Sequence, residues 1–547
     1  MKIHFNGKEI EINNDKKTVK EIFENEIKAS ANNVIACVCN NEVKSLEHEV
    51  KDNDKIELLD ITDKDGMRIY IRGLLYIMSM AFYRLYPNIK VKVNYQLSNA
   101  MFCEIEGAMI TEEIIKNVKD KMQEIISKNL PIKKVIMDKE EAKEFYEKEN
   151  SIRGRLQVRN KEKETVSLYF CEEYYNYFFG VMPISTGNIN LFDISKYKDG
   201  FIVRYPNRKN SQELGVFRET KKLQATLEEY DDINSLMHIN TIYDLNKQIY
   251  EGNSTDVILT AEALHEKKLS ELANKIASKR NVKIVLIAGP SSSGKTTFAK
   301  RLGIQLKLHG LNPVTIGTDN YFVERSETPR DENGEYDFEA IEALDLELFN
   351  NHLIKLINGE EIDVPTFDFK LGTKKYNGNK MSLKENEILV IEGIHSLNDK
   401  LTSTIPKENK FKVYLSDLTV LNIDDYNRIS TTDTRLIRRI VRDNNFRNYS
   451  ALDTLKRWNS VNRGEERNIF PFQEEADVMF NSSLVYELTA LAKYAKPLLE
   501  EINHSEKEYG EAKRLSTLLG YFEPINEDII PNNSIIREFI GGSIFEY

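Results

Sequence analysis

The chain has 547 residues, of which 41% are hydrophobic and 30% are charged. This length exceeds what one hydrophobic core supports and predicts three or four soluble globular domains. The net charge of −11 excludes a general binder of polyanions, so contact with RNA would need a local basic patch. The N-terminal sequence MKIHFNGKEIEI is not a signal-peptide pattern, and no apolar run approaches membrane-spanning length. We therefore expect a cytoplasmic protein that makes no membrane contact, and the sequence leaves a homo-oligomer open.

The four cysteines are Cys37, Cys39, Cys103 and Cys171. Cys37 and Cys39 lie two residues apart inside an apolar run, a spacing that fits no metal-ligand pattern. We expect all four to be buried free thiols, which suits a reducing compartment.

Residues 1–62 are predicted to form a small β-rich unit. Alternating or apolar runs predict strands at 2–5, 9–12, 34–39 and 55–59. The turn Asn6-Gly7 between the first two is a hairpin signal, and residues 18–28 form an amphipathic helical pattern. This order, with the closing sequence DNDKIELLDITDKDG, resembles the TGS domain of threonyl-tRNA synthetases, which implies a β-grasp fold.

Residues 63–230 extend that resemblance. Helical patterns at 71–86 and 111–128 are followed by LYFCEEYYNYFFGVMP at 168–183. The succession resembles the second, α+β domain of threonyl-tRNA synthetases, in which HxxxH and CxxxH motifs form a metal and editing site. The matching positions here are Arg72, Tyr76, Phe178 and Met182. None is a good zinc ligand, so we expect the scaffold without the metal, with the aromatic residues Tyr174–Tyr177 serving in packing.

Residues 231–280 are predicted to be a helical connector, with helices at 242–249 and 261–277. Residues 281–547 alternate strand and helix patterns, which predicts a parallel α/β sheet followed by a C-terminal extension. The strands are predicted at 284–288, 314–317, 388–391, 411–415 and 477–481. The helices are predicted at 295–309, 346–356, 434–443, 450–462 and 484–502. The end of the chain, SIIREFIGGSIFEY, is apolar enough to pack onto the body.

A P-loop pattern lies between the first of these strands and its helix. It comprises Gly289, Pro290, Ser291, Ser292, Ser293, Gly294, Lys295, Thr296 and Thr297. In this context the backbone N–H groups and the helix N-terminus bind phosphate, as in ATP- or GTP-binding proteins. Lys295 is expected to reach the β- and γ-phosphates, and the Thr296 hydroxyl to ligate Mg²⁺.

Two acids follow apolar strands. Asp319 is placed at the C-terminal end of a strand, where it can hold Mg²⁺ or take a proton from an attacking hydroxyl. Glu392 takes the position of a Walker-B acid that supports Mg²⁺. The alternatives are a helix-capping aspartate and a solvated strand-end carboxylate. His395 is expected to be structural, because no Ser or Cys stands near it in a nucleophilic arrangement, and Trp458 is expected in a core or interface.

Five arginines form a basic stretch, namely Arg435, Arg438, Arg439, Arg442 and Arg447. Most of them share one helix face, which self-repulsion makes costly unless an anion meets it. In a P-loop kinase that anion is the triphosphate, so we expect a lid that closes over it and stabilises the transferred phosphoryl group. A solvated basic face is the alternative.

Six motifs occur in family order: GPSSSGKTT, TDNYF, ETPRDENGEYDFEAIEALD, PTFDF, LVIEG and DTRLIRRIVRD. Together they resemble the uridine kinase and phosphoribulokinase family. The resemblance implies Asp319 as catalytic base, Tyr321 near the substrate, and Asp337 on the ribose hydroxyls. It puts Phe367 where uridine kinases have a tyrosine near the base. Lys370 and Lys374 occupy the region of a family histidine, which leaves the base preference open.

We therefore predict a kinase that moves the γ-phosphoryl group of ATP or GTP to the 5′-hydroxyl of a nucleoside, with Mg²⁺. Lys295, Asp319 and Arg442 are the expected catalytic residues, and Arg435 is expected to contact substrate. Two alternatives stay open. One is a kinase of another sugar or metabolite, and the other is a tRNA- or nucleotide-sensing protein with a P-loop switch, against which the acidic net charge argues.

Overall fold

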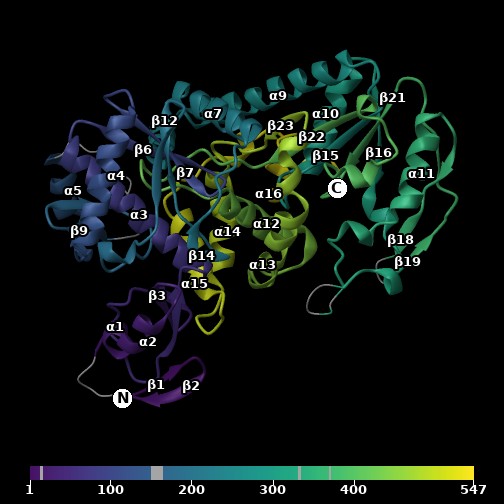
Figure 1. The fold of residues 1–547 in the computed structure, drawn as a ribbon. Helices are drawn as coiled ribbons and strands as arrows, with labels where there is room; N and C mark the ends of the chain where they lie inside the picture. Colours follow the sequence, from purple (N-terminus) through teal and green to yellow (C-terminus); the bar gives the residue numbers. More distant parts are fainter. Residues whose placement is uncertain (13–16, 149–163, 331–333, 335, 369–370, 547) are drawn as a thin grey trace.

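A computed structural model describes residues 1–12, 17–148, 164–330, 334, 336–368 and 371–546. The N-terminal half lies beside the C-terminal half, and the first sheet projects from the rest of the molecule (Figure 1). None of the helices in these ranges is long and apolar enough to cross a membrane. Lys370 lies outside the described residues.

The first sheet has the order β2-β1-β5-β3-β4. Its strands are β1 (Lys2–Phe5), β2 (Lys8–Glu11), β3 (Val34–Cys39), β4 (Glu42–Lys44) and β5 (Lys55–Asp60). The central strands β1 and β5 are parallel and the other pairs antiparallel. Asn6 and Gly7 form the predicted turn with φ of 48° and 79°, which suits a type I′ hairpin. The TGS identity of this unit stays a prediction.

The helix predicted at 18–28 is two short helices, α1 (Val19–Ile22) and α2 (Glu24–Ala29). They break at Phe23, whose buried ring packs on Phe5 with centroids 4.3 Å apart. Local periodicity did not reveal this break, which lies where Phe23 packs against Phe5 of β1, a residue distant in the sequence.

The second unit packs a long helix, α3 (Lys64–Leu85), on the sheet β11-β12-β7-β6. These strands are β6 (Lys90–Leu97), β7 (Ala100–Glu106), β11 (Asp193–Tyr197) and β12 (Gly200–Arg204). Around them lie α4 (Glu112–Ser127), α5 (Lys139–Lys148), β8 (Lys133–Asp138), β9 (Thr165–Cys171), β10 (Tyr174–Asn176), β13 (Pro206–Asn207) and β14 (Asn210–Leu214). All four cysteines are buried free thiols, as predicted.

The four positions that match the synthetase metal ligands are filled by packing. Tyr76, Phe178 and Met182 are at most 2% exposed and share one core. The Tyr76 hydroxyl donates to the Tyr169 carbonyl at 3.0 Å, and the Arg72 guanidinium donates to the Val181 carbonyl. Burial lowers the pKa of Arg72 to about 10. These side chains occupy the space with rings and a cation, which are poor zinc ligands.

The helices α7 (Lys221–Leu236), α8 (Ile242–Tyr250) and α9 (Ser254–Ser278) follow. The predicted boundary at residue 230 falls inside α7. Ile242, Ile258 and Leu269 share a core with Phe298 and Leu302 of the P-loop unit. The segment predicted as a connector therefore packs as part of the P-loop unit, and the domain boundaries stay predictions.

The P-loop unit is built on a parallel sheet in the order β16-β21-β15-β22-β23. Its strands are β15 (Ile284–Ala288), β16 (Asn312–Gly317), β21 (Glu387–Glu392), β22 (Lys410–Ser416) and β23 (Val478–Asn481), close to the predicted ranges. Two small antiparallel sheets follow: β17 (Ile362–Asp363) pairs with β20 (Lys380–Met381), and between them in the chain β18 (Thr366–Asp368) pairs with β19 (Thr373–Lys375).

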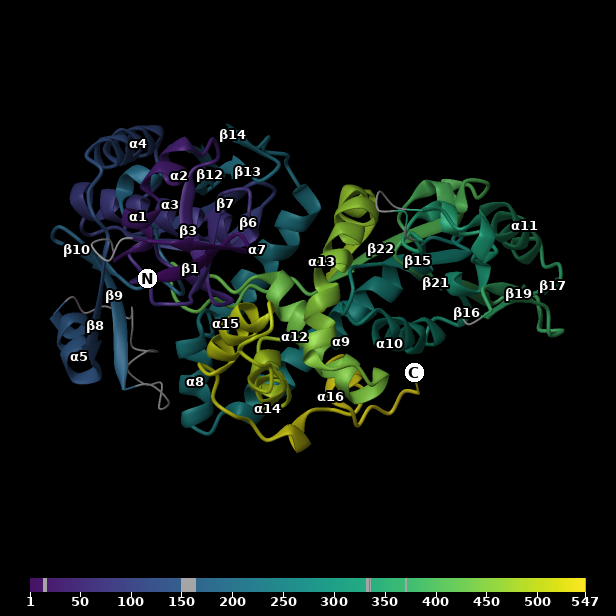
Figure 2. The same ribbon diagram turned by 90° about the horizontal axis from the view of Figure 1, so that it is seen from below.

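Alternation along β15 explains why helices cover both faces. Ile284 and Leu286 pack toward α11 (Leu346–Ile357), while Val285 and Ile287 pack toward α10 (Lys295–Lys307). The remaining helices are α12 (Thr431–Arg447), α13 (Ala451–Asn468), α14 (Glu487–Glu500), α15 (Tyr509–Leu519) and α16 (Arg537–Ile540). The tail packs back as expected, and the C-terminal end lies near α10 and α16 in both views (Figures 1 and 2).

A buried loop, residues 417–430, joins the two halves. Leu418 and Val420 share a core with Tyr95 and Phe102 of the second unit. The Val93 amide donates to the Asp425 carbonyl at 2.7 Å. The N-terminal half is thus packed against the P-loop unit through an apolar and hydrogen-bonded contact rather than through a linker alone.

Candidate active site

The P-loop turns sharply between β15 and α10. Ser292 and Gly294 have φ of 62° and 84°, the left-handed region that a turn of this kind requires. A Cβ at Gly289 would lie 2.0 Å from the Leu415 carbonyl oxygen, so only glycine allows this approach to β22. The Lys295 ammonium folds over the loop and donates to the carbonyls of Gly289 and Pro290 at 2.9 and 3.1 Å.

A cleft of about 870 Å³ opens above this loop. Its walls include the predicted residues Ser291, Ser292, Gly294, Lys295, Thr296, Asp319, Glu392, Arg439, Arg442 and Arg447. These side chains come from the C-terminal ends of β15, β16 and β21 and from α12. Convergence at the carboxyl edge of a parallel sheet is the usual place for a ligand in this architecture.

Both predicted acids line the cleft and interact electrostatically with Lys295. Asp319 is open to the cleft, yet the surrounding walls raise its pKa above the ordinary aspartate value, and Lys295 opposes the shift. Burial also raises the pKa of Glu392, again opposed by Lys295. The Thr296 hydroxyl lies 3.4 Å from a Glu392 carboxylate oxygen, so hydroxyl and carboxylate oxygens meet where the sequence predicts Mg²⁺.

Three arginines of α12 line the cleft. Arg439 and Arg442 contact the Asp443 carboxylate at 3.2 and 2.8 Å, and Arg447 lies 3.7 Å from it. Arg439 also donates to the Ser291 hydroxyl at 2.7 Å. Asp443 therefore holds these guanidinium groups together at the cleft wall.

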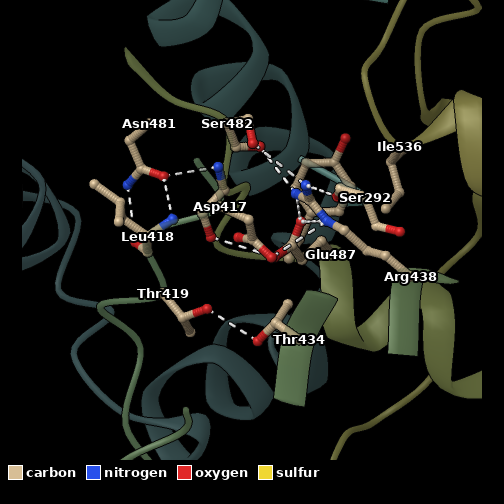
Figure 3. Close-up of polar contacts among 12 residues, drawn as sticks. Ser292, Asp417, Leu418, Thr419, Thr434, Arg438, Asn481, Ser482, Glu487 and Ile536 are labelled. Carbon is tan, nitrogen blue, oxygen red and sulfur yellow. Dashed lines mark hydrogen bonds and ion pairs between the residues drawn. The ribbon is translucent and has the colours of Figure 1, made fainter. Parts of the chain in front are cut away.

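Arg435 and Arg438 do not take the cleft positions expected of them, and the closing of α12 as a lid stays a prediction. They are 1% and 0% exposed and do not line the cleft. Arg435 is paired with Glu465 at 2.6 Å. Arg438 donates to Glu487 at 3.1 Å and lies 3.4 Å from Asp417 (Figure 3).

Helix α12 thus packs into the core along one side, while Arg439, Arg442 and Arg447 of the same helix line the cleft. Leu436, Ile437, Ile440 and Val441 are buried in the main core, so the helix is apolar on the side away from the arginines. The arginine side rests on the P-loop, where Arg435 and Arg438 donate to the carbonyls of Ser291 and Ser292 at 3.3 Å. Buried carboxylates of the protein itself therefore offset the repulsion between the arginines of this face.

The expected acceptor residues do not line the cleft. Tyr321 is buried, and its hydroxyl lies 2.9 Å from Nδ1 of His352. Phe367 packs against Phe322, with ring centroids 5.5 Å apart. Asp337 accepts from Arg467 at 2.9 Å. Lys374 is bound to Asp345.

Other residues of the cleft wall were not predicted as ligands. Phe322, Phe338, Glu339, His395, Glu465 and Glu538 belong to this set. Burial lowers the pKa of His395 to about 4, so its ring is neutral near neutral pH. Glu465 and Glu538 come from helices far along the chain, and nothing in their local sequence marks them. Trp458 is in the core, as expected, below Arg435.

Comparison with known proteins finds one class of relative for the P-loop unit and another for the N-terminal part. Residues 284–488 match the model of the phosphoribulokinase / uridine kinase family. A uridine kinase of Staphylococcus haemolyticus is 27% identical over 200 residues, which cover 36% of this chain and 87% of that protein. A solved structure of a possible uridine kinase from Bacillus stearothermophilus, 21% identical, covers 37% of this chain and 89% of that one; its TM-score of 0.24 is too low to add to the assignment.

The N-terminal part resembles a different class of protein. A probable cytoplasmic threonine–tRNA ligase of Enterocytozoon bieneusi is 27% identical over 202 residues, which are 37% of this chain. The chain spans about a third of that relative, 31% of its length. Residues 284–488 therefore form a domain of the phosphoribulokinase and uridine kinase family, joined in one chain to an N-terminal part similar to threonine–tRNA ligases.

Proposed function

We propose that this protein is a Mg²⁺-dependent kinase that transfers the γ-phosphoryl group of ATP or GTP to the 5′-hydroxyl of a nucleoside such as uridine. The observation that carries the proposal is the cleft in which Lys295, Asp319 and Glu392 converge above the P-loop. A cation for phosphate, a base for a hydroxyl and an acid for a metal ion are the parts that phosphoryl transfer needs.

On the donor side, the P-loop offers backbone N–H groups and two further polar groups. The Lys295 ammonium donates hydrogen bonds to two carbonyls of the loop, and these bonds hold it beside the loop. The Ser292 hydroxyl is buried in the cleft wall and meets no hydrogen-bond partner among the described residues, which suits a phosphate oxygen. Thr296 and Glu392 would hold Mg²⁺, which supplies charge neutralisation for the phosphates.

On the acceptor side, Asp319 is the candidate base. It follows β16 directly and is open to the cleft, so an acceptor hydroxyl can reach its carboxylate. Its raised pKa brings the group closer to the range in which a general base works well at neutral pH. The rings of Phe322 and Phe338, 6.2 Å apart and nearly perpendicular, provide an apolar wall beside it.

A kinase of another sugar or metabolite is the second candidate. It is favoured by Asp337, which the family resemblance assigns to ribose but which pairs with Arg467 outside the cleft wall. The two candidates share the donor side and differ only in the acceptor.

The test is a screen of nucleosides and phosphorylated sugars with ATP, GTP and Mg²⁺, measured as nucleoside diphosphate release. Each active acceptor is then checked by mass spectrometry of its phosphorylated product. The Lys295→Ala variant serves as the inactive control. Acceptor-dependent release that is lost in this variant supports a kinase, and the identity of the acceptor separates the two candidates. Absence of release with every acceptor contradicts both.

A further inference from the structure

The C-terminal tail reaches into the phosphate-binding loop. Residues 534–546, which we call the strap, run from the core of the P-loop unit across the start of α10. Within it, α16 places the Glu538 side chain in the wall of the cleft. Glu538 accepts from the backbone N–H of Thr297 at 3.1 Å and from its hydroxyl at 2.7 Å.

This contact occupies a place made for an anion. Thr297 is the third residue of α10, so its N–H has no partner within the helix and carries part of the positive end of the helix dipole. In a P-loop these N–H groups bind the α- and β-phosphates of a nucleotide. The Thr297 N–H and hydroxyl cannot bind the Glu538 carboxylate and a phosphate at the same time. Two anions at that distance would also repel each other.

The strap is anchored, so the position of Glu538 is fixed. Ile535, Ile536 and Phe539 are fully buried in the main core. A Cβ at Gly294 would lie 2.6 Å from Ile535, which shows how closely the strap covers the P-loop glycine. The Asn445 side chain of α12 donates to the Phe539 carbonyl at 3.0 Å.

Further contacts hold both ends of the strap. Ser534 donates to Glu262 of α9, and Arg537 donates to the carbonyls of Glu527 and Ile530 at 2.8 and 2.7 Å. At the outer end, Lys300 of α10 donates to the Glu546 carbonyl. Residues on both sides of Glu538 are therefore tied to the elements that carry the P-loop.

The charge around the cleft points the same way. Four cationic side chains line it, Lys295, Arg439, Arg442 and Arg447, against five carboxylates, Asp319, Glu339, Glu392, Glu465 and Glu538. A second carboxylate, Glu465, accepts from the backbone N–H of Ser291 at 2.8 Å. Glu465 is also bound to Arg435, so it belongs to a buried ion pair, whereas Glu538 is hydrogen-bonded to Thr297.

We propose that Glu538 is an internal competitor of nucleotide phosphate: its carboxylate occupies the anion seat at Thr297, and the strap keeps the donor site in a low-affinity state until the carboxylate is displaced. The inference rests on the proposed function, because it takes a nucleotide as the ligand of the P-loop. The apparent affinity of the wild-type chain is then the intrinsic affinity multiplied by the fraction of molecules in which Glu538 does not occupy the site at Thr297.

The experiment compares the wild-type chain with Glu538→Gln, which keeps the shape of the side chain and removes its charge. Dissociation constants for Mg·ATP and for Mg·tripolyphosphate are measured by titration calorimetry. Because charge-assisted hydrogen bonds are about twice as strong as neutral ones, we expect both ligands to bind about 10-fold more tightly to Glu538→Gln. Tripolyphosphate has no base or ribose, so a matching gain for both ligands places the competition at the phosphates.

The control is Glu546→Gln, which removes the same charge from an exposed position of the same strap and should leave both constants unchanged. Thermal unfolding without ligand checks that each variant is folded. If Glu538→Gln does not fold, Glu538→Asp gives the same comparison, because one methylene less withdraws the carboxylate from Thr297 and should also tighten binding.

The outcomes separate this proposal from the proposed function. Equal affinity of the wild-type chain and the Glu538 variants overturns the competitor and leaves the kinase intact. Weaker binding by the variants also overturns it, because Glu538 would then support the ligand. No binding of nucleotide to any form overturns both the competitor and the kinase.

Discussion

Lys295 and Asp319 stand in the same cleft, and the proposed function gives them different partners. The Lys295 ammonium lies on the P-loop carbonyls, where the proposed function has it meet phosphate charge. Asp319 follows the end of β16, where the proposed function has it take the proton of the acceptor hydroxyl. The two substitutions should therefore separate donor binding from chemistry.

We expect Asp319→Asn to lower kcat by about 10²- to 10⁴-fold, as losses of a general base do, while the dissociation constant for Mg·ATP stays unchanged. Lys295→Ala should weaken Mg·ATP binding and turnover together. The rate of ADP release gives kcat, and titration calorimetry gives the dissociation constant for Mg·ATP. Asp256→Asn, an exposed carboxylate on α9, is the matched control. Full activity in Asp319→Asn would remove Asp319 from the mechanism.

Asp337 distinguishes the two acceptor classes. If it turns from Arg467 to a ribose, Asp337→Ala should raise the KM for the nucleoside about 10-fold or more, because it removes charge-assisted hydrogen bonds worth about 1.5–3 kcal/mol each. The KM for ATP should change little. Arg467→Met, which frees Asp337 without removing it, should not raise the nucleoside KM. An unchanged nucleoside KM in Asp337→Ala would favour the other sugar or metabolite.

His265 makes stability depend on pH. Its ring packs on Phe480, Nε2 lies 3.1 Å from the Ser483 carbonyl, and buried Nδ1 meets no partner among the described residues. Burial lowers its pKa from 6.5 to about 3. Below pH 6.5 the unfolded chain therefore protonates this histidine, whereas the folded chain keeps it neutral down to about pH 3. The free energy of unfolding consequently falls as pH drops from 6.5 toward 3.

For one proton the slope is about 1.4 kcal/mol per pH unit within this window. Urea unfolding of the wild-type chain and of His265→Gln between pH 7 and 4.5 measures it, and the variant should show a slope smaller by that amount. The exposed His309→Gln should keep the wild-type slope. An identical slope for His265→Gln and the wild type would mean that His265 charges in the folded state.

At the scale of the element, α12 shows how a basic helix can be internal. Its arginines meet carboxylates from three other segments: Asp417 after β22, Glu465 in α13 and Glu487 in α14. Burial raises the pKa of Glu487 above its ordinary value, and Arg438 opposes that shift. The Arg438 guanidinium thus binds two acids, Asp417 and Glu487, and also donates a hydrogen bond to the Ser292 carbonyl of the P-loop (Figure 3).

Removing that guanidinium should be costly. Arg438→Met leaves Asp417 and Glu487 buried without a countercharge, and breaking a buried pair in this way typically costs about 3–5 kcal/mol. Denaturant unfolding should show this loss, and Arg463→Met, on the exposed side of α13, should change stability by less than about 0.5 kcal/mol. An Arg438→Met protein as stable as the wild type would show that the two acids are held neutral without the arginine.

At the scale of the whole molecule, the N-terminal half and the P-loop unit share charged contacts as well as the loop 417–430. Arg68 of α3 and Arg514 of α15 both contact Asp433 at the start of α12, at 3.2 and 2.7 Å. Lys513 of α15 contacts Glu42 of β4 at 3.1 Å. The N-terminal half therefore contacts the helix that lines the cleft.

The second unit should lack the editing chemistry of the proteins it resembles. The resemblance implies that Tyr76, Phe178 and Met182 stand at the positions of that family's metal ligands, and these buried side chains offer no donor set for a water-activating metal. We expect the purified chain to leave seryl-tRNA(Thr) intact over a time in which an editing synthetase hydrolyses it. Deacylation above the buffer rate would show that another group in this unit carries the chemistry.

The sequence alone determined most of the long helices and strands and the residues around the P-loop. Strong periodicity and glycine signals are local, so the P-loop, the five parallel strands and the positions of Asp319 and Glu392 could be predicted from nearby residues. The arginine stretch was correctly predicted as a helix with one basic side, because helical spacing is also local.

What meets that basic side was decided only by the tertiary structure. Arg435 and Arg438 are neutralised by Glu465, Asp417 and Glu487, which lie up to about fifty residues away in the chain, and no local pattern pairs them. The same holds for Glu538, more than two hundred residues from Thr297, and for the break at Phe23. Burial and ion pairing depend on which distant segments meet, and that is settled when the chain packs.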